Sequence, residues 1–156
     1  MRSNAWTGFQ TVVCPVDFSA ASRAALRHAA AVAVRGNARL VVLHVNDPLL
    51  TTAAAVALRD RAFARRTGVE LRRFVDAVLG LRLRDRLRAT TRVAVGAAAD
   101  GILIAAARER ADLIVMGTHG RRGFERLVMG SDAELVLRAS TVPVLLVRAI
   151  QAESVS

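Results

Sequence analysis

The sequence predicts an α/β protein: a single doubly wound domain with a five-stranded parallel sheet and helices on both faces. Short apolar runs of strand length recur five times, and segments with helical spacing or glycine-rich connections separate them. Alternation of strands and helices favours an open parallel sheet, and parallel strands covered on both faces read as near-continuous apolar runs. No linker, repeat or low-complexity segment divides the chain, and its 156 residues suit one domain.

The predicted strands are short runs rich in Val, Leu and Ile. They cover residues 11–16, 40–45, 91–95, 113–116 and 144–147. Pro15 cannot donate a ladder hydrogen bond, so we expect it at the end of the first strand. Asn46, Asp47 and Pro48 form a turn signal that ends the second strand.

The first predicted helix covers residues 20–35. Leu26, Ala30 and Ala33 recur at helical spacing and define its buried face. Ser19 precedes the helix and is a favoured N-cap residue, because its hydroxyl can accept a hydrogen bond from a free N–H of the first turn. Gly36 follows the helix and suits the left-handed C-cap.

Later helices are predicted from similar spacing. They cover residues 51–66, 102–110 and 132–139. Residues 69–88 mix apolar side chains with arginine around a break at Gly80, and the pattern leaves the boundaries there open. Ser131, with Glu134 three residues later, predicts a capping box at the start of the last helix.

The composition limits the cellular setting. Hydrophobic residues make up 53% of the chain and aromatic residues 4%, so the core must consist mainly of Ala, Val and Leu. Cys14 is the only cysteine, which rules out an intrachain disulfide. Residues 1–10 have no long apolar region, and no run reaches the length of a membrane span. We therefore expect a cytoplasmic protein without a membrane partner.

The charge is strongly positive and unevenly placed. Net charge is +10, all 23 basic residues are arginine, and residues 59–92 hold eleven arginines against four acidic residues, a net +7. Such a patch can attract phosphate, nucleic acid or an anionic surface, or it can be a solvated arginine-rich helix face. Because aromatic stacking platforms are scarce, we expect no nucleic-acid partner.

A glycine-rich segment over residues 117–131 is the most informative part of the chain. It follows a predicted strand and precedes a predicted helix, where doubly wound folds bind ligands. A helix N-terminus there offers free N–H groups to a phosphate. The segment has neither the Gly-Lys-Ser/Thr of a Walker A loop nor the Rossmann spacing. It is either a phosphate loop of another kind or a tight turn without a ligand.

The spacing of this segment resembles that of the universal stress protein family. The family pattern is Gly-x-x-Gly, nine residues, then Gly-Ser/Thr; the matching stretch here is Gly117-Thr118-His119-Gly120, nine residues, then Gly130-Ser131. Residues 15–19 resemble the start of the family's sequence, and residues 43–45 and 141–147 resemble its second and last strands. The resemblance covers residues 11–148 and leaves residues 1–10 as an N-terminal extension and 149–156 as a C-terminal tail.

This resemblance implies a strand order of 3-2-1-4-5 and a site for ATP, with Mg²⁺. Carried onto this chain, the nucleotide-contacting positions are Pro15, Val16, Asp17, Val45, Met116, Gly117, Gly120, Gly130, Ser131 and Asp132. Asp17 would contact the adenosine, Val45 would pack near the base, and Gly130 with Ser131 would hold phosphates.

Several of these residues have a purely structural interpretation as well. Asp17 could serve only the turn, and Val45 and Met116 could be ordinary core. Asp132 departs from the family, which usually has an apolar residue there. Its carboxylate suits the helix dipole but would repel a triphosphate. Gly101 is a second departure, in the first turn of a helix where the family often has an acidic residue.

Two functions remain open. The resemblance implies an ATP-binding regulatory module of the stress response, with an unidentified regulatory protein partner and a homodimer formed through the last strand. The edge of that strand would be the physical reason for pairing. The alternative is an interaction protein of the same fold that binds no nucleotide. We expect no enzyme, since the sequence offers no dedicated base, nucleophile or metal cluster, although weak ATP hydrolysis stays open.

Overall fold

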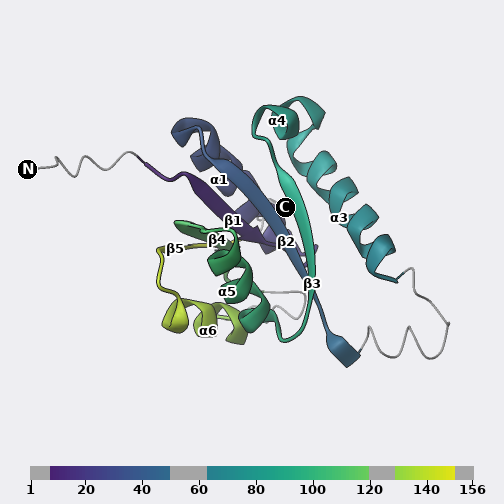
Figure 1. Cartoon of the computed structure of the whole chain (residues 1–156), viewed down its shortest axis with the longest axis vertical. Helices are drawn as coiled ribbons and strands as arrows, with labels where there is room; N and C mark the ends of the chain where they lie inside the picture. Colours follow the sequence, from purple (N-terminus) through teal and green to yellow (C-terminus); the bar gives the residue numbers. More distant parts are fainter. Residues whose placement is uncertain (1–7, 50–62, 120–128, 150–156) are drawn as a thin grey trace, which may run out of the picture.

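The computed structural model describes residues 8–49, 63–119 and 129–149. They form one parallel sheet in the order β3-β2-β1-β4-β5, which confirms the predicted fold class and strand order. The strands are β1 (Thr11–Pro15), β2 (Arg39–Asn46), β3 (Thr90–Val95), β4 (Leu113–Gly117) and β5 (Val144–Val147) (Figure 1). Pro15 ends β1, as expected of a residue without an N–H.

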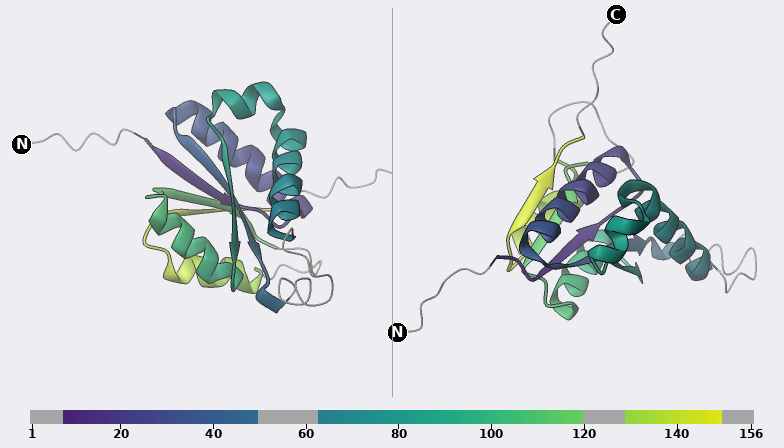
Figure 2. Two further views of the ribbon diagram at one scale, coloured as in Figure 1. Left: turned by 45° about the vertical axis from the view of Figure 1, so that its right-hand side comes forward. Right: turned by 90° about the horizontal axis from the view of Figure 1, so that it is seen from above.

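Helices cover both faces of this sheet (Figure 2). They are α1 (Ala20–Gly36), α3 (Phe63–Leu79), α4 (Leu81–Arg86), α5 (Ala98–Arg108) and α6 (Ser131–Ala139). Side chains of β1 alternate between the two faces, because successive residues of a strand point in opposite directions. Val12 and Cys14 pack with α1 and α3, whereas Val13 packs with α5 and α6.

The order of the strands fixes where a ligand can bind. β1 lies at the centre and pairs with β2 on one side and with β4 on the other. The chain therefore reverses its direction of travel across the sheet between β1 and β4. In open α/β sheets the connections from two such strands diverge to opposite faces and leave a crevice at the carboxyl ends.

The start of α1 agrees with the prediction, and its end does not. Ser19 is the N-cap, and its Oγ accepts a hydrogen bond from the Ser22 N–H at 3.1 Å. The left-handed residue at the other end is Asn37, with φ 51°, rather than Gly36. Gly36 closes the helix for a different reason: a Cβ there would lie 3.0 Å from the Phe9 carbonyl oxygen.

The helix predicted over residues 51–66 is confirmed for residues 63–66 and extends beyond Arg66. α3 runs without interruption from Phe63 through Gly68 to Leu79, and residues 51–62 lie outside the described residues. Thr67, Leu71 and Val75 are buried at a spacing of four residues, and this stripe extends from one side of Gly68 to the other. Gly80, with φ 75°, separates α3 from α4 at the predicted break.

α5 begins four residues before the predicted start. Ala99 and Ile102 are both buried, so the apolar stripe extends into the first turn. Gly101 lies in that turn, and a Cβ there would meet both methyl groups of Val45 at 2.9 Å. The missing side chain at this position thus lets α5 approach the end of β2.

The buried interior also settles the state of the lone thiol. Cys14 is fully buried in β1, and desolvation raises the pKa of its thiol. A thiol held in its neutral form is a poor nucleophile. Within the described ranges, no helix is long and apolar enough to cross a membrane.

Candidate functional site

A cleft of about 590 Å³ opens at the carboxyl ends of the central strands. The turns after β1 and β2, the end of β4 and the first turns of α5 and α6 surround it. The described residues that line it are Pro15, Val16, Asp17, Ser22, His44, Val45, Asp47, Ala98, Ile102, Met116, Gly117, Thr118, His119, Gly130, Ser131, Asp132 and Ala133. The cleft thus occupies the crevice that the strand order creates.

The turn between β1 and α1 forms one side of the cleft. Phe18 has a φ of 67°, a left-handed conformation that a bulky residue adopts only under the constraint of its neighbours. Asp17 Oδ1 accepts a hydrogen bond from the Ser19 N–H at 3.1 Å. Asp17 therefore stabilises the turn, and it also lines the wall of the cleft.

His44 holds this turn in place from β2. Its Nδ1 lies 2.7 Å from the carbonyl oxygen of Val16, and because a carbonyl only accepts, Nδ1 donates the hydrogen. The Phe18 ring lies 4.7 Å from the imidazole and packs edge-on against Phe74. In the sequence, His44 stands out only as part of a strand motif. Its contacts with Val16 and Phe18, in the turn after β1, are visible only in the tertiary structure.

Apolar side chains form the floor and one wall. Met116 is buried at the end of β4, with 6% of its surface exposed. Val45, at the end of β2, is half-buried and packs against the backbone of Gly101. Ile102 continues this wall from α5. Val45 and Met116 thus belong to the core and also line the cleft.

The two described ends of the glycine-rich segment are fixed to each other. Gly130 donates its N–H to the Thr118 carbonyl at 2.8 Å, and Thr118 donates its own N–H to Val147 of β5 at 3.0 Å. A Cβ on Gly130 would lie 3.2 Å from the same carbonyl oxygen. Gly120 and the three arginines of this segment (Arg121, Arg122 and Arg126) lie outside the described residues.

Gly117 is required by packing alone. A Cβ at this position would lie 2.9 Å from the Cβ of Ala21 and 3.0 Å from its backbone carbon. The end of β4 therefore approaches the first turn of α1 more closely than any side chain permits. The glycine keeps this edge of the cleft open and joins two of its walls.

The capping box predicted for α6 is wrong. The helix begins at Ser131, its N-cap is Gly130 in an extended conformation, and no side chain of the described residues caps it. Glu134 instead forms an ion pair with Arg138, at 2.7 Å. Since the extended residue is the glycine, the Ser131 hydroxyl lies one position too late to cap, and the first N–H groups of α6 face the cleft without a side-chain partner.

The described part of the lining is acidic rather than basic. It contains Asp17, Asp47 and Asp132, and it contains no arginine. Ser131 and Asp132 are exposed in the first turn of α6. Within residues 8–49, 63–119 and 129–149, no three His, Cys, Asp or Glu residues come together as a metal site. Within the described part of the lining, the N-terminus of α6 is a source of positive potential at this end.

Comparison with known proteins places the chain in a family. The model of the universal stress protein family matches residues 8–148. The chain belongs to the universal stress protein family. A universal stress protein of Thermus aquaticus is 33% identical over 141 residues, which cover 90% of this chain and 99% of that protein.

Solved structures agree with this assignment. Universal stress protein UspA from Lactobacillus plantarum is 26% identical, with a TM-score of 0.70 over 90% of this chain and 99% of that one. A universal stress protein solved in complex with cAMP is 27% identical, with a TM-score of 0.63 over 92% and 99%.

In this universal stress protein, the cleft brings together nine of the ten residues predicted for the site. They are Pro15, Val16, Asp17, Val45, Met116, Gly117, Gly130, Ser131 and Asp132, and the tenth, Gly120, lies outside the described residues. The contact of each with a ligand stays a prediction. The sequence did not single out Asp47, Thr118, Ala98 and Ile102 as site residues, because each joins the cleft only through the packing of β2, β4 and α5.

Proposed function

We propose that this universal stress protein binds ATP, with Mg²⁺, in the cleft and acts as a nucleotide-dependent regulatory module of the stress response. The observation that carries the proposal is that one cavity contains both the Asp17 turn and the uncapped start of α6. Its volume of about 590 Å³ lies in the range of small-molecule sites. The solved relative in complex with cAMP supports an adenine nucleotide as the ligand.

The two ends of the cleft suit the two ends of a nucleotide. Asp17 can accept hydrogen bonds from ribose hydroxyls, and Val45 and Met116 offer apolar surface to the base. Gly130 and Ser131 stand where the N–H groups of α6 can donate to phosphate oxygens. Each part of the ligand thereby meets a group of matching chemistry.

Magnesium fits the acidic character of the lining. Asp132 would face the phosphates, and its carboxylate would repel them. A cation bound to the phosphates reduces that repulsion, and Mg²⁺ takes oxygen ligands from phosphates and one or two carboxylates.

The proposal also includes the role and the location of the protein. We propose that the protein is regulatory rather than catalytic and that it is cytoplasmic.

Isothermal titration calorimetry tests the proposal on protein stripped of carried-over nucleotide. We expect MgATP to bind the wild type with a dissociation constant on the order of micromolar. Gly130→Val should abolish binding, because its side chain would stand against the Thr118 carbonyl and the start of α6. Gly68→Ala is the matched control, since a Cβ there meets only the Arg72 guanidinium at 3.9 Å. Circular dichroism checks that both variants fold.

An interaction protein without a nucleotide is the second candidate. The exposed carboxylate of Asp132 at the phosphate end favours it. Absence of heat with MgATP, with ADP and with cAMP in folded, nucleotide-free wild type would support this candidate and would contradict the first.

A homodimer through β5 is part of both candidates. β5 lies at the edge of the sheet, and Leu145 on it is 39% exposed. An open edge strand pairs readily with a second copy. Sedimentation analysis should give a dimer for the wild type and a monomer for Leu145→Arg, while a monomeric wild type would contradict the proposal.

A further inference from the structure

A second cavity lies on the opposite side of the sheet from α5 and α6. It is a groove of about 450 Å³ between α1 and the end of α3 with α4, helices that lie side by side in both views of Figure 2. Its lining is Arg27, Ala30, Ala31, Val34, Arg35, Val78, Leu79 and Leu83. None of these residues lines the nucleotide cleft, so the groove is a separate feature.

The bottom of the groove is apolar because small residues face large ones. Ala30 and Ala31 on α1 leave space that Leu79 and Leu83, on the facing helices, do not fill. Ala31 is exposed, and Leu83 is half-buried. The neighbouring Leu81 on α4 is 59% exposed. A trough of this kind between two helices is the shape that binds the apolar face of a further helix.

The rim of the groove is positively charged. Arg27 and Arg35 border it from α1, both are exposed, and neither forms an ion pair with any described residue. No acidic residue appears among its described lining. The nearby carboxylates of Asp76 and Asp85 are both engaged by Arg84, at 2.7 and 2.9 Å. The charges on the rim therefore lack a counterpart among the residues that the structure describes.

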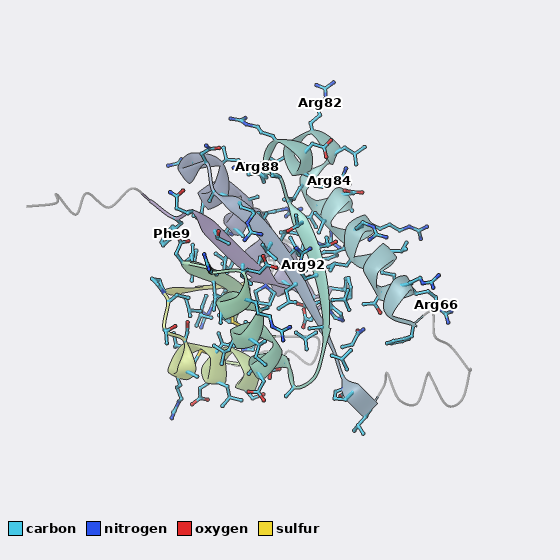
Figure 3. The ribbon with its side chains drawn as sticks, in the orientation of Figure 1. Phe9, Arg66, Arg82, Arg84, Arg88 and Arg92 are labelled. Carbon is cyan, nitrogen blue, oxygen red and sulfur yellow. The ribbon has the colours of Figure 1, made fainter. Side chains whose placement is uncertain are left out.

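The surface beyond the rim has the same sign. Arg82 and Arg86 on α4 are exposed and make no ion pair with the described residues, and Figure 3 shows Arg82 extending from α4 into solvent. Arg92, by contrast, is bound to Glu109 at 3.1 Å. The uncompensated part of the arginine-rich segment therefore continues the positive rim from α1 onto α4.

We propose that this groove binds an acidic amphipathic helix of a protein partner. Arg27 and Arg35 are eight residues apart, about 12 Å along α1 at 1.5 Å per residue. Carboxylates two turns apart on the partner helix can reach both guanidiniums, and arginine pairs with carboxylate through two parallel hydrogen bonds. Apolar residues between those carboxylates fill the space over Ala30 and Ala31.

The shape of the surface favours a helix over a membrane. Surfaces that bind membranes insert a protruding apolar face into the lipid. Here Ala30 is 2% exposed and Leu83 is half-buried, whereas Arg27 and Arg35 on the rim are exposed. A flat bilayer could meet the arginines but could not reach Ala30 or Leu83, whereas a helix can reach both.

The test uses a library of helical peptides displayed on phage. The library is selected on the full-length protein and depleted on the double variant Arg27→Glu/Arg35→Glu. We expect enriched peptides to carry Glu or Asp two turns apart with Leu, Ile or Phe between them. Fluorescence anisotropy of one enriched, labelled peptide then gives its dissociation constant for each protein variant.

The variants separate charge from shape. Arg27→Glu/Arg35→Glu should weaken binding at least tenfold, and so should Ala31→Phe, which fills the groove without changing any charge. Arg108→Glu removes an exposed arginine on α5 and should leave the affinity within twofold. Ala31 is exposed, so its replacement does not disturb the core.

Four outcomes would overturn the proposal. They are failure of any peptide to enrich, enrichment of basic peptides, equal weakening by Arg108→Glu, and unchanged binding in Ala31→Phe. Two further outcomes assign the groove to another occupant and overturn it equally. One is tighter capture by phosphatidylglycerol vesicles than by the peptide, and the other is self-association of the wild type that Arg27→Glu/Arg35→Glu abolishes.

Discussion

The helices α1 and α6 both begin at the edge of the cleft, yet their first turns differ in one respect. The first turn of α1 is capped from within the chain, by Ser19 at 3.1 Å from the Ser22 nitrogen. The first turn of α6 starts from Gly130 and has no side-chain cap. Every α-helix has free N–H groups at its start. In α1 a side chain caps one of them, whereas no described side chain caps those of α6, which face the cleft.

This difference separates a structural helix start from one that can bind a ligand. A serine cap satisfies one of the N–H donors of the first turn and leaves it unavailable to a phosphate. A glycine N-cap leaves all of them available and lets the ligand approach the backbone. The Thr118 carbonyl, which holds the Gly130 nitrogen, keeps the α6 start at the end of β4.

Giving α6 its own cap should produce the largest effect. In Gly130→Asp the carboxylate would accept from the first N–H groups and repel phosphate, so MgATP affinity should fall at least about tenfold. Gly130→Ala is the matched control, because it adds the same Cβ without the charge. Calorimetry measures both. Equal loss in the two variants would show that space rather than capping decides binding.

Removing the cap of α1 should cost stability and leave binding intact. Ser19→Ala deletes the hydroxyl that accepts from Ser22, and the free energy of unfolding should fall by about 1 kcal/mol. Urea denaturation measures this change. MgATP affinity should stay within twofold, because the Asp17 carboxylate still accepts from the backbone N–H of residue 19. A tenfold loss of affinity would mean that this helix start also serves the ligand.

Neutralising the carboxylate at the start of α6 should strengthen ATP binding. Asp132→Asn removes a negative charge beside the proposed phosphate position, so MgATP affinity should rise about threefold, within the range of one helix-terminus charge. The gain should be smaller for cAMP, which has a single phosphate charge. Asp100→Asn is the control, an acidic residue of the first turn of α5 that does not line the cleft. Unchanged affinity in Asp132→Asn would place the phosphates elsewhere.

The smallest effect should come from Ser131, the residue that sequence reasoning placed in a capping box. The hydroxyl caps nothing in the structure, so Ser131→Ala should change the free energy of unfolding by less than about 0.3 kcal/mol. Urea denaturation beside Ser19→Ala makes the comparison direct. A cost near 1 kcal/mol, as for a true N-cap, would restore the capping box and weaken the contrast between the two helices.

Sequence reasoning performed best where local pattern and burial agree. The strand runs predicted the sheet, because strands covered on both faces must be apolar throughout. Ser19 and Pro15 were placed correctly, since each acts through its own backbone or nearest neighbours. The glycine spacing identified the loop ends, and the structure brings Gly117 and Gly130 to one cleft.

It failed where a distant contact decides between local alternatives. Capping by Ser131 or by Gly130 depended on a hydrogen bond from Gly130 to Thr118, across a segment of the chain that sequence spacing cannot place. The continuity of α3 across Gly68 depended on burial of Thr67, Leu71 and Val75, and Thr67 accepts a hydrogen bond from Asn46 of β2. The left-handed residue is Asn37 rather than Gly36, and the Phe9 carbonyl leaves little room for a side chain at Gly36.

The sequence by itself determined the family, the class of fold and the segments that form the site. Apolar periodicity and glycine spacing are local properties, so they can be read directly from the order of the residues. The tertiary structure decided which groups face the cleft and which are already satisfied. It placed His44 within hydrogen-bond distance of the Val16 carbonyl and Gly101 in contact with Val45. It also formed a groove bordered by arginine between α1 and α4. These contacts join residues far apart in the chain, so only packing of the helices against the sheet could specify them.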